Sequence, residues 1–153
     1  MANAPGGNTI RLSLPSRLEL LGVVDKIADG ITELLDFEDV DRDAVAISVI
    51  EACTNAIQHG HRTNTEKRVE ISFTIDNDSL TIVIEDHGSG FTPLSAEEQT
   101  PPDLLATRGR GIYIMRSMMD EVDFDFSNGT RVLLVKRRSS EGTEGGEAEG
   151  NPA

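Results

Sequence analysis

The sequence predicts an α+β fold: a two-layer sandwich in which helices cover one face of a mostly antiparallel sheet. Segments that alternate apolar and polar residues, as half-buried strands do, lie at 9–14, 68–75, 80–86 and 121–136. Segments with apolar residues at helical spacing lie between the first strand and the others, at about 15–35 and 41–59. Because the later strands follow one another in pairs, the order favours α+β over a parallel α/β sheet.

The first strand and two helices make up the N-terminal part of the prediction. Pro15 follows the strand at 9–14 and is expected to open the first helix, which runs to about Leu35. Asp41 is placed as the N-cap of the second helix, because its carboxylate can accept a hydrogen bond from a free amide of the first turn. Gly60 follows this helix as its C-cap.

Two predicted hairpins follow, separated by an irregular segment. Residues 88–110 contain three prolines and no regular period. Because a loop of that length is usually functional or disordered, we expect a lid over about 91–110. A helix is then expected from Ile112, followed by a closing hairpin that turns at 127–129.

The chain is expected to form one domain over 9–138, since 153 residues suit a single core. Residues 1–8 are expected to be a flexible N-terminus. Residues 139–153 contain four Glu and four Gly but no Ile, Leu, Val or Phe, which predicts a disordered acidic tail.

Composition narrows the classes of partner. The formal net charge of −13 repels phosphate backbones, so no direct nucleic-acid partner is expected, although a nucleotide in a shaped pocket remains compatible. The lone cysteine, Cys53, rules out an intrachain disulfide, and in an apolar helix we expect its thiol to be inert. There is no apolar run of about 18 residues and no signal-peptide pattern, so we expect a cytoplasmic protein with no membrane contact.

A polar stripe on the second helix is the first candidate site. Ser48, Glu51, Asn55 and Gln58 recur every three or four residues in a helix that is otherwise apolar, so their face should meet something other than bulk water. The carboxylate of Glu51 and the amide of Asn55 point from one face and suit a hard cation or a reacting hydroxyl. Polar contacts to neighbouring loops are the alternative explanation.

The second candidate is the stretch "DHGSG", Asp86 to Gly90, at the end of a predicted strand. Gly88 and Gly90 let the backbone approach a ligand closely, and Asp86 can accept hydrogen bonds from a ligand amine. An ordinary glycine turn with a capping aspartate is the alternative.

The third candidate is the stretch "TRGRGI", in which Gly109, Arg110 and Gly111 directly precede a predicted helix. Free amides of a first helical turn, together with the helix dipole, bind anions, and Arg110 adds positive charge. A flexible hinge is the alternative.

Other nucleotide and metal patterns are absent from the sequence. It has no G-x-x-x-x-G-K-[ST] P-loop, and "GRGIYI" lacks the last glycine of the Rossmann pattern. The spacing of His59 and His61 cannot place both rings on one helical face, so a zinc site is not expected. His59 is instead placed where it can face a phosphate.

Taken in order, these motifs resemble the GHKL ATPase family with its Bergerat ATP-binding fold. They are E-x-x-x-N on a helix, D-x-G-x-G after a strand, a long lid, and G-x-G before a helix. The stretches "EACTNAIQHG", "DHGSGF", "RGRGIYIMRSMMDEV" and "GTRVLLVKRR" are most similar to the anti-sigma-factor serine/threonine kinases of bacterial partner-switching systems. The resemblance covers roughly 8–138.

The resemblance implies roles for residues outside the lid. Asn55 would hold Mg²⁺ through its amide oxygen, and Glu51 would act as the general base on the attacking hydroxyl. Asp86 would accept a hydrogen bond from the exocyclic amine of adenine, and Thr130 would lie near that aspartate.

For the glycine-rich stretches, the resemblance implies contacts with the nucleotide. Gly88 and Gly90 would make room for the base. Gly109, Arg110 and Gly111 would close over the phosphates. The implied ligands are ATP or ADP with Mg²⁺.

The implied activity is phosphorylation of a serine or threonine on a STAS-domain anti-sigma-factor antagonist. The implied protein also sequesters a sigma factor and is a homodimer. One alternative is a non-catalytic ATP/ADP-binding module that switches protein partners. Another is a stand-alone histidine-kinase-like catalytic domain, which the absence of a phosphoacceptor helix makes less favourable.

Overall fold

Five strands form one antiparallel sheet with the spatial order β1-β2-β3-β5-β4. The computed structural model describes residues 8–60, 67–86, 102–125 and 129–139. The strands are β1 (Thr9–Pro15), β2 (Arg68–Ile75), β3 (Ser79–Asp86), β4 (Glu121–Asp125) and β5 (Thr130–Arg137). Both predicted hairpins are confirmed, because β2 pairs with β3 and β4 pairs with β5.

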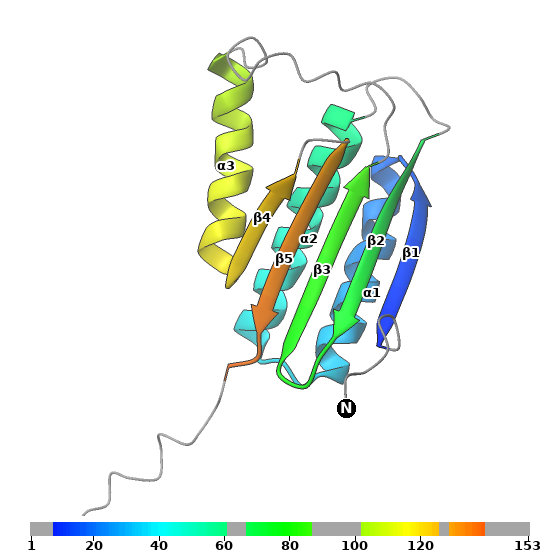
Figure 1. Ribbon diagram of the computed structural model, residues 1–153, viewed down its shortest axis with the longest axis vertical. Coiled ribbons are helices and arrows are strands. Elements are labelled where there is room, and N and C mark those ends of the chain that lie inside the picture. The colour runs from blue at the N-terminus through cyan, green and yellow to red at the C-terminus, as the bar shows by residue number, and fades with distance from the viewer. Residues whose placement is uncertain (1–7, 61–66, 87–101, 126–128, 140–153) are drawn as a thin grey trace, which may run out of the picture.

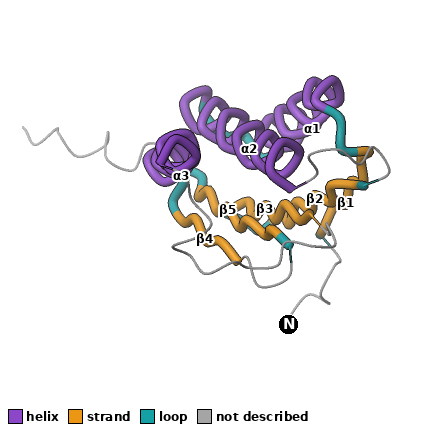
Figure 2. The backbone as a smooth tube through the Cα atoms, turned by 90° about the horizontal axis from the view of Figure 1, so that it is seen from above, coloured by secondary structure: helices purple, strands orange, loops and turns teal. Residues whose placement is uncertain are grey.

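Helices cover one face of this sheet only. They are α1 (Leu21–Leu34), α2 (Asp39–Gly60) and α3 (Pro102–Met118), with a short 3-10 turn, η1 (Leu18–Leu20), before α1. Figure 1 shows the helices behind the sheet or beside it, and Figure 2 shows the two layers from above. The predicted α+β fold, a two-layer sandwich of antiparallel sheet and helices, is therefore confirmed.

The core lies between the two layers and follows the alternation in the strands. Every second residue of β2 and β3 is buried against the helices, whereas the residues between them face the other side of the sheet. The buried set on these strands is Val69, Ile71, Phe73, Leu80, Ile82 and Ile84. Because α2 packs against α1, α3 and three of the strands, it is the central helix, as its apolar sequence predicted.

Two predicted element ends are wrong. Pro15 is the last residue of β1, so it ends the strand instead of opening a helix. Asp41 lies inside α2, which begins at Asp39, and the backbone N–H of Arg42 donates to the carbonyl of Glu38 at 2.8 Å. The helix ladder therefore starts from Glu38, and the Asp41 carboxylate is free for other contacts.

The Asp41 carboxylate joins three distant segments. It accepts a hydrogen bond from the hydroxyl of Ser139 at 2.6 Å and faces the ammonium group of Lys136 at 3.6 Å. The same ammonium group donates to the carbonyl of Met118, the last residue of α3, at 2.8 Å. The start of α2, the end of α3 and the chain beyond β5 are thus tied together. Ser139, the first residue of the predicted tail, belongs to this cluster, whereas 140–153 lie outside the described residues.

The predicted start of the third helix is also wrong. α3 begins at Pro102, a residue type well suited to the first helical position, and not at Ile112. Residues 102–110 of the predicted lid are therefore helical, whereas 91–101 lie outside the described residues. Gly109 and Gly111 caused this error. Glycine in a helix interior is less favourable than alanine by about 1 kcal/mol, so the prediction began the helix after these residues.

Candidate functional site

Two residues of the polar stripe of α2, Glu51 and Asn55, lie close to Gly111 of α3. A β-carbon built on Gly111 would lie 3.1 Å from Oε2 of Glu51 and 3.3 Å from Nδ2 of Asn55. These separations are tighter than ordinary van der Waals contact, so a β-carbon at this position would require the ends of the Glu51 and Asn55 side chains to move by a few tenths of an ångström. The structure thus brings together three residues that the sequence placed in two separate motifs.

The stripe changes from buried to exposed along the helix. Ser48 is fully buried, Glu51 and Asn55 are half-buried, and Gln58 is exposed. The hydroxyl of Ser48 has no hydrogen-bond partner among the described residues. The polar residues of the stripe therefore do not share one environment, and Glu51 and Asn55 lie at the boundary between core and solvent.

Asp86 is the buried acid of the candidate site. It is the last residue of β3 and is only 2 % exposed. On the sheet it lies between Val69 of β2 and Thr130 of β5, its register partners. Thr130 is thus the register neighbour of Asp86 on β5, and its predicted place beside the nucleotide stays a prediction. Figure 1 shows that the end of β3, the start of β5 and the C-terminal end of α2 lie at the same end of the molecule.

The glycine-rich stretch on α3 does not precede a helix. Gly109, Arg110 and Gly111 lie inside α3, so their amides do not belong to a first turn and the expected helix-start anion site is wrong. Arg110 is exposed and Gly111 is buried. A contact between this stretch and phosphates stays a prediction.

The remaining predicted residues are only partly described or lie outside the described residues. His59 is the penultimate residue of α2, and its side chain lies outside the described part of the structure. Gly88 and Gly90 lie outside the described residues, so their predicted place beside the base is untested.

The donor set at Asn55 fits a cation that brings most of its own ligands. No group of three or more His, Cys, Asp or Glu side chains converges on a possible metal position anywhere in 8–60, 67–86, 102–125 and 129–139. Asn55 and Glu51 together offer one amide and one carboxylate. Mg²⁺ is usually bound by one or two protein ligands together with water and substrate phosphates. This part of the chain therefore suits Mg²⁺ carried by a nucleotide.

Cys53 is buried, as expected for a cysteine in an apolar helix. It lies on α2 at 1 % exposure, and burial raises the pKa of its thiol to about 12. The thiol is therefore protonated at neutral pH, whereas only the thiolate is a strong nucleophile.

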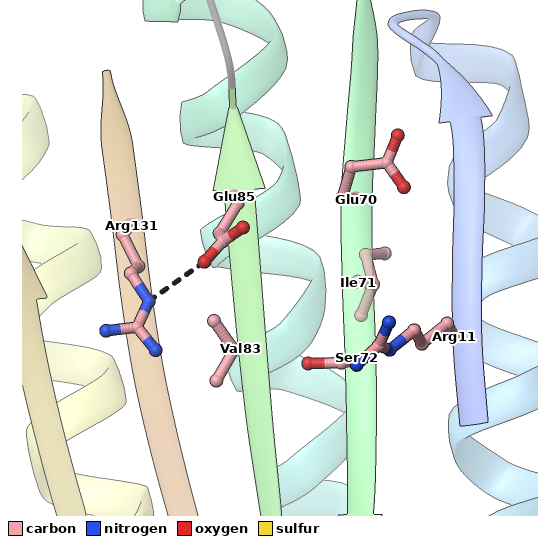
Figure 3. Close-up of a pocket in the computed structure, with 7 residues that line it drawn as sticks. All are labelled: Arg11, Glu70, Ile71, Ser72, Val83, Glu85 and Arg131. Atoms are coloured by element: carbon pink, nitrogen blue, oxygen red, sulfur yellow. Dashed lines mark hydrogen bonds and ion pairs between the residues drawn. The ribbon is translucent and has the colours of Figure 1, made fainter. Parts of the chain in front are cut away.

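One hollow in the described surface lies away from these residues, on the outer face of the sheet. It measures about 360 Å³ and is lined by residues of β1, β2, β3 and β5. Figure 3 shows Arg131 donating to Glu85 there, with Nε 2.9 Å from Oε1. The prediction missed this hollow because alternating polar residues on strands indicate only an exposed face. It contains no predicted site residue and is floored by strand backbone, so we do not assign the nucleotide to it.

Comparison with known proteins identifies the class of the chain. Residues 14–136 match the family model of the histidine kinase-like ATPase domain. The chain belongs to this family, and the predicted membership in the GHKL group is confirmed.

Several similar proteins carry the name serine-protein kinase RsbW. The chain is 30 % identical to the one from Bacillus licheniformis over 145 residues and 28 % identical to the one from Bacillus velezensis over 144 residues, covering 90 % of each chain in both cases. It is 27 % identical to the one from Bacillus subtilis over 139 residues, which cover 86 % of this chain and 87 % of that one. Separately, no helix in the described part of the chain is long and apolar enough to cross a membrane.

Proposed function

We propose that the protein is an ATP-dependent serine/threonine kinase and an anti-sigma factor. It would phosphorylate a STAS-domain anti-sigma-factor antagonist and sequester a sigma factor. One observation carries the proposal: Glu51 and Asn55 lie side by side at the edge of the core, in a chain whose relatives are named serine-protein kinases.

Asp86 would select the base of the nucleotide. Its buried carboxylate accepts hydrogen bonds, and the exocyclic amine of adenine supplies a donor. Guanine has a carbonyl oxygen at the same place, so a carboxylate would meet an acceptor. A buried polar group left without a partner costs about 1–3 kcal/mol, which is enough for a clear preference for ATP. Thr130, on the neighbouring strand, is the next residue in reach of the base.

Asn55 and Glu51 would have different roles at the phosphates, Asn55 in holding the metal ion and Glu51 in accepting the proton. The amide oxygen of Asn55 would hold Mg²⁺, which when bound supplies charge neutralisation at the phosphate oxygens. Arg110, exposed beside Gly111 on α3, would add positive charge on the same side, together with Gly109.

Glu51 would orient the acceptor hydroxyl and take its proton. The hydroxyl oxygen of the acceptor forms a bond to the γ-phosphorus, and the bond from that phosphorus to the bridging oxygen of the β-phosphate breaks. ADP leaves, and the proton of the hydroxyl ends on Glu51. Phosphoryl transfer depends mainly on positioning and charge neutralisation, which so few groups can provide.

Replacing Glu51 separates binding from transfer. Glu51→Gln keeps the size and polarity of the side chain but removes the base, so we expect unchanged ATP affinity and phosphoryl transfer at least about 100-fold slower. The measurement is transfer of labelled phosphate from ATP and Mg²⁺ to purified STAS-domain proteins of the source organism, with ATP affinity measured by calorimetry.

Glu33→Gln is the matched control, because it makes the same change at an exposed glutamate of α1 and should leave transfer unchanged. Asp86→Asn is the control for the binding assay and should weaken ATP binding. Equal transfer by Glu51→Gln and the parent would refute the role of Glu51.

A second candidate function is a non-catalytic module in which ATP or ADP selects the protein partner. The specific observation in its favour is that Gly111 of α3 lies close to Oε2 of Glu51 and Nδ2 of Asn55, so α3 occupies space that an acceptor hydroxyl would need on that side of the carboxylate. Label on any STAS-domain protein favours the kinase. ATP binding by all variants with no label anywhere favours the module.

The same proposal includes a homodimer located in the cytoplasm, in contact with protein partners and not with nucleic acid. Sedimentation of the purified protein would test the dimer. A pull-down followed by mass spectrometry would identify the sigma factor and the antagonist.

A further inference from the structure

Ser48 is an anomaly in the packing of α2. It is fully buried, and its hydroxyl is the one buried side-chain nitrogen or oxygen within the described residues that lacks a hydrogen-bond partner. Such atoms are rare, because leaving a buried polar group unpaired costs free energy. Alanine would fill the same place without that cost.

A second buried hydroxyl shows how such a group is normally satisfied. Thr32 on α1 is also fully buried, and its hydroxyl lies 3.1 Å from the carbonyl of Ala28, four residues earlier on the same helix. Ser48 makes no such bond to its own helix. Its hydroxyl is therefore available for a different acceptor.

The Glu51 carboxylate is the side-chain acceptor that helix spacing places on the same face as Ser48, three residues further on. Residues three apart on a helix have β-carbons about 5–6 Å apart. A long side chain on a helix also lies over the preceding turn, which for Glu51 is the turn that contains Ser48. At present the Oε2 atom of Glu51 lies against Gly111. A ligand that moved α3 would remove this contact and leave the carboxylate free to turn toward Ser48.

We propose that Ser48 is a positioning residue for Glu51, donating a hydrogen bond to its carboxylate when nucleotide and acceptor are bound. The inference rests on the proposed function, since it concerns the proposed general base. The hydroxyl would hold one carboxylate oxygen, leaving the other to meet the acceptor proton. This role would explain why serine, and not alanine, occupies the position. Its hydroxyl lacks a partner in this structure but would gain one when nucleotide and acceptor are bound.

The test compares Ser48→Ala with Thr32→Val, which removes a buried hydroxyl far from the candidate site. We expect Ser48→Ala to lower kcat about tenfold and to change KM for ATP less than twofold, whereas Thr32→Val leaves both unchanged. Ser48→Ala should also resist urea at least as well as the parent, which a serine with a merely structural role would not explain. Ser48→Thr, which keeps the hydroxyl, should restore most of kcat.

A second measurement does not depend on catalysis. In protein labelled with ¹³C at glutamate carboxyl groups and saturated with Mg²⁺ and a non-hydrolysable ATP analogue, the Glu51 resonance should move in Ser48→Ala and not in Thr32→Val. An unmoved resonance overturns the inference, as does an unchanged kcat. If Ser48→Thr does not fold, Ser48→Ala and this resonance still decide the matter. A Ser48-dependent resonance without phosphoryl transfer to any protein would refute the kinase and leave the positioning role standing.

Discussion

At the scale of single residues, Gly111 shows how one missing β-carbon can shape a site. In α3 it costs helix stability, yet it lets the backbone come close to Glu51 and Asn55. Two other helical glycines, Gly22 and Gly30, have open space where a β-carbon would lie. The same substitution should therefore have opposite effects at these positions.

We expect Gly30→Ala to stabilise the fold by about 0.5–1 kcal/mol, because alanine lowers the entropy of the unfolded chain and nothing opposes its methyl group. Gly111→Ala should destabilise the fold or displace α3, because its methyl group would lie 3.1 Å from Oε2 of Glu51. Urea unfolding of both variants measures the free energies. A gain in stability at Gly111 equal to that at Gly30 would show that α3 does not need this close approach.

At the scale of elements, the Asp41 cluster holds the ends of α2 and α3 together. The side chains of Lys136 and Asp41 are 14 % and 8 % exposed, so their opposite charges compensate each other largely out of water, alongside their bonds to Met118 and Ser139. Removing one partner of a buried pair costs about 3–5 kcal/mol, because the remaining charge stays buried without compensation.

Asp41→Ala should accordingly lower the free energy of unfolding by several kcal/mol, which thermal or urea unfolding would measure. Ser139→Ala removes only a hydroxyl donor and should cost about 1 kcal/mol. Lys136→Met with Asp41→Ala removes both charges and should recover much of the loss of the single variant. Similar losses in Asp41→Ala and Ser139→Ala would show that the ion pair contributes little.

The elements also show which features the sequence could predict. β2 was predicted with its observed bounds and β3 to within one residue, because a strand with one buried face carries its period in its own residues. The start of α3 was missed, since the reason for Gly111 lies on α2 and not in the local sequence. The Asp41 cluster was missed for a similar reason, because its partners lie almost a hundred residues apart in the chain.

The same reasoning applies to the candidate site. Glu51 and Asn55 could be predicted together because helix spacing alone places them on one face. Their contact with Gly111 needs the packing of two helices, which no local pattern contains. The unpaired hydroxyl of Ser48 could not be predicted, because a serine in a polar stripe looks the same in sequence whether or not a partner is present.

At the scale of the whole molecule, the buried thiol of Cys53 makes the stability of the fold depend on pH. Burial raises the pKa of its thiol from 9.0 to about 12, so the folded state retains the thiol proton where the unfolded state loses it. This contribution to stability is complete below about pH 9 and is lost as the pH rises towards 12. The loss approaches about 1.4 kcal/mol per pH unit within that window.

We therefore expect the stability of the parent to fall faster than that of Cys53→Ala between pH 9 and the highest pH at which the protein folds. Urea unfolding of both proteins at a series of pH values measures this difference in stability. Groups that titrate in the same way in both proteins do not contribute to the difference. A thiol reagent at pH 8 should modify the protein only at the rate of unfolding. Parallel pH dependences would mean that the thiol is hydrated in the folded state.

The bond from Lys136 to the carbonyl of Met118 gives α3 one anchored end. From that anchor the helix extends about 24 Å to Pro102, whereas Gly111 lies only about 10 Å along it. If α3 tilted by about 10° around this anchored end, Pro102 would move by about 4 Å and Gly111 by about 2 Å. A small displacement over Glu51 is accordingly magnified at the far tip, where a spectroscopic label would detect it most readily.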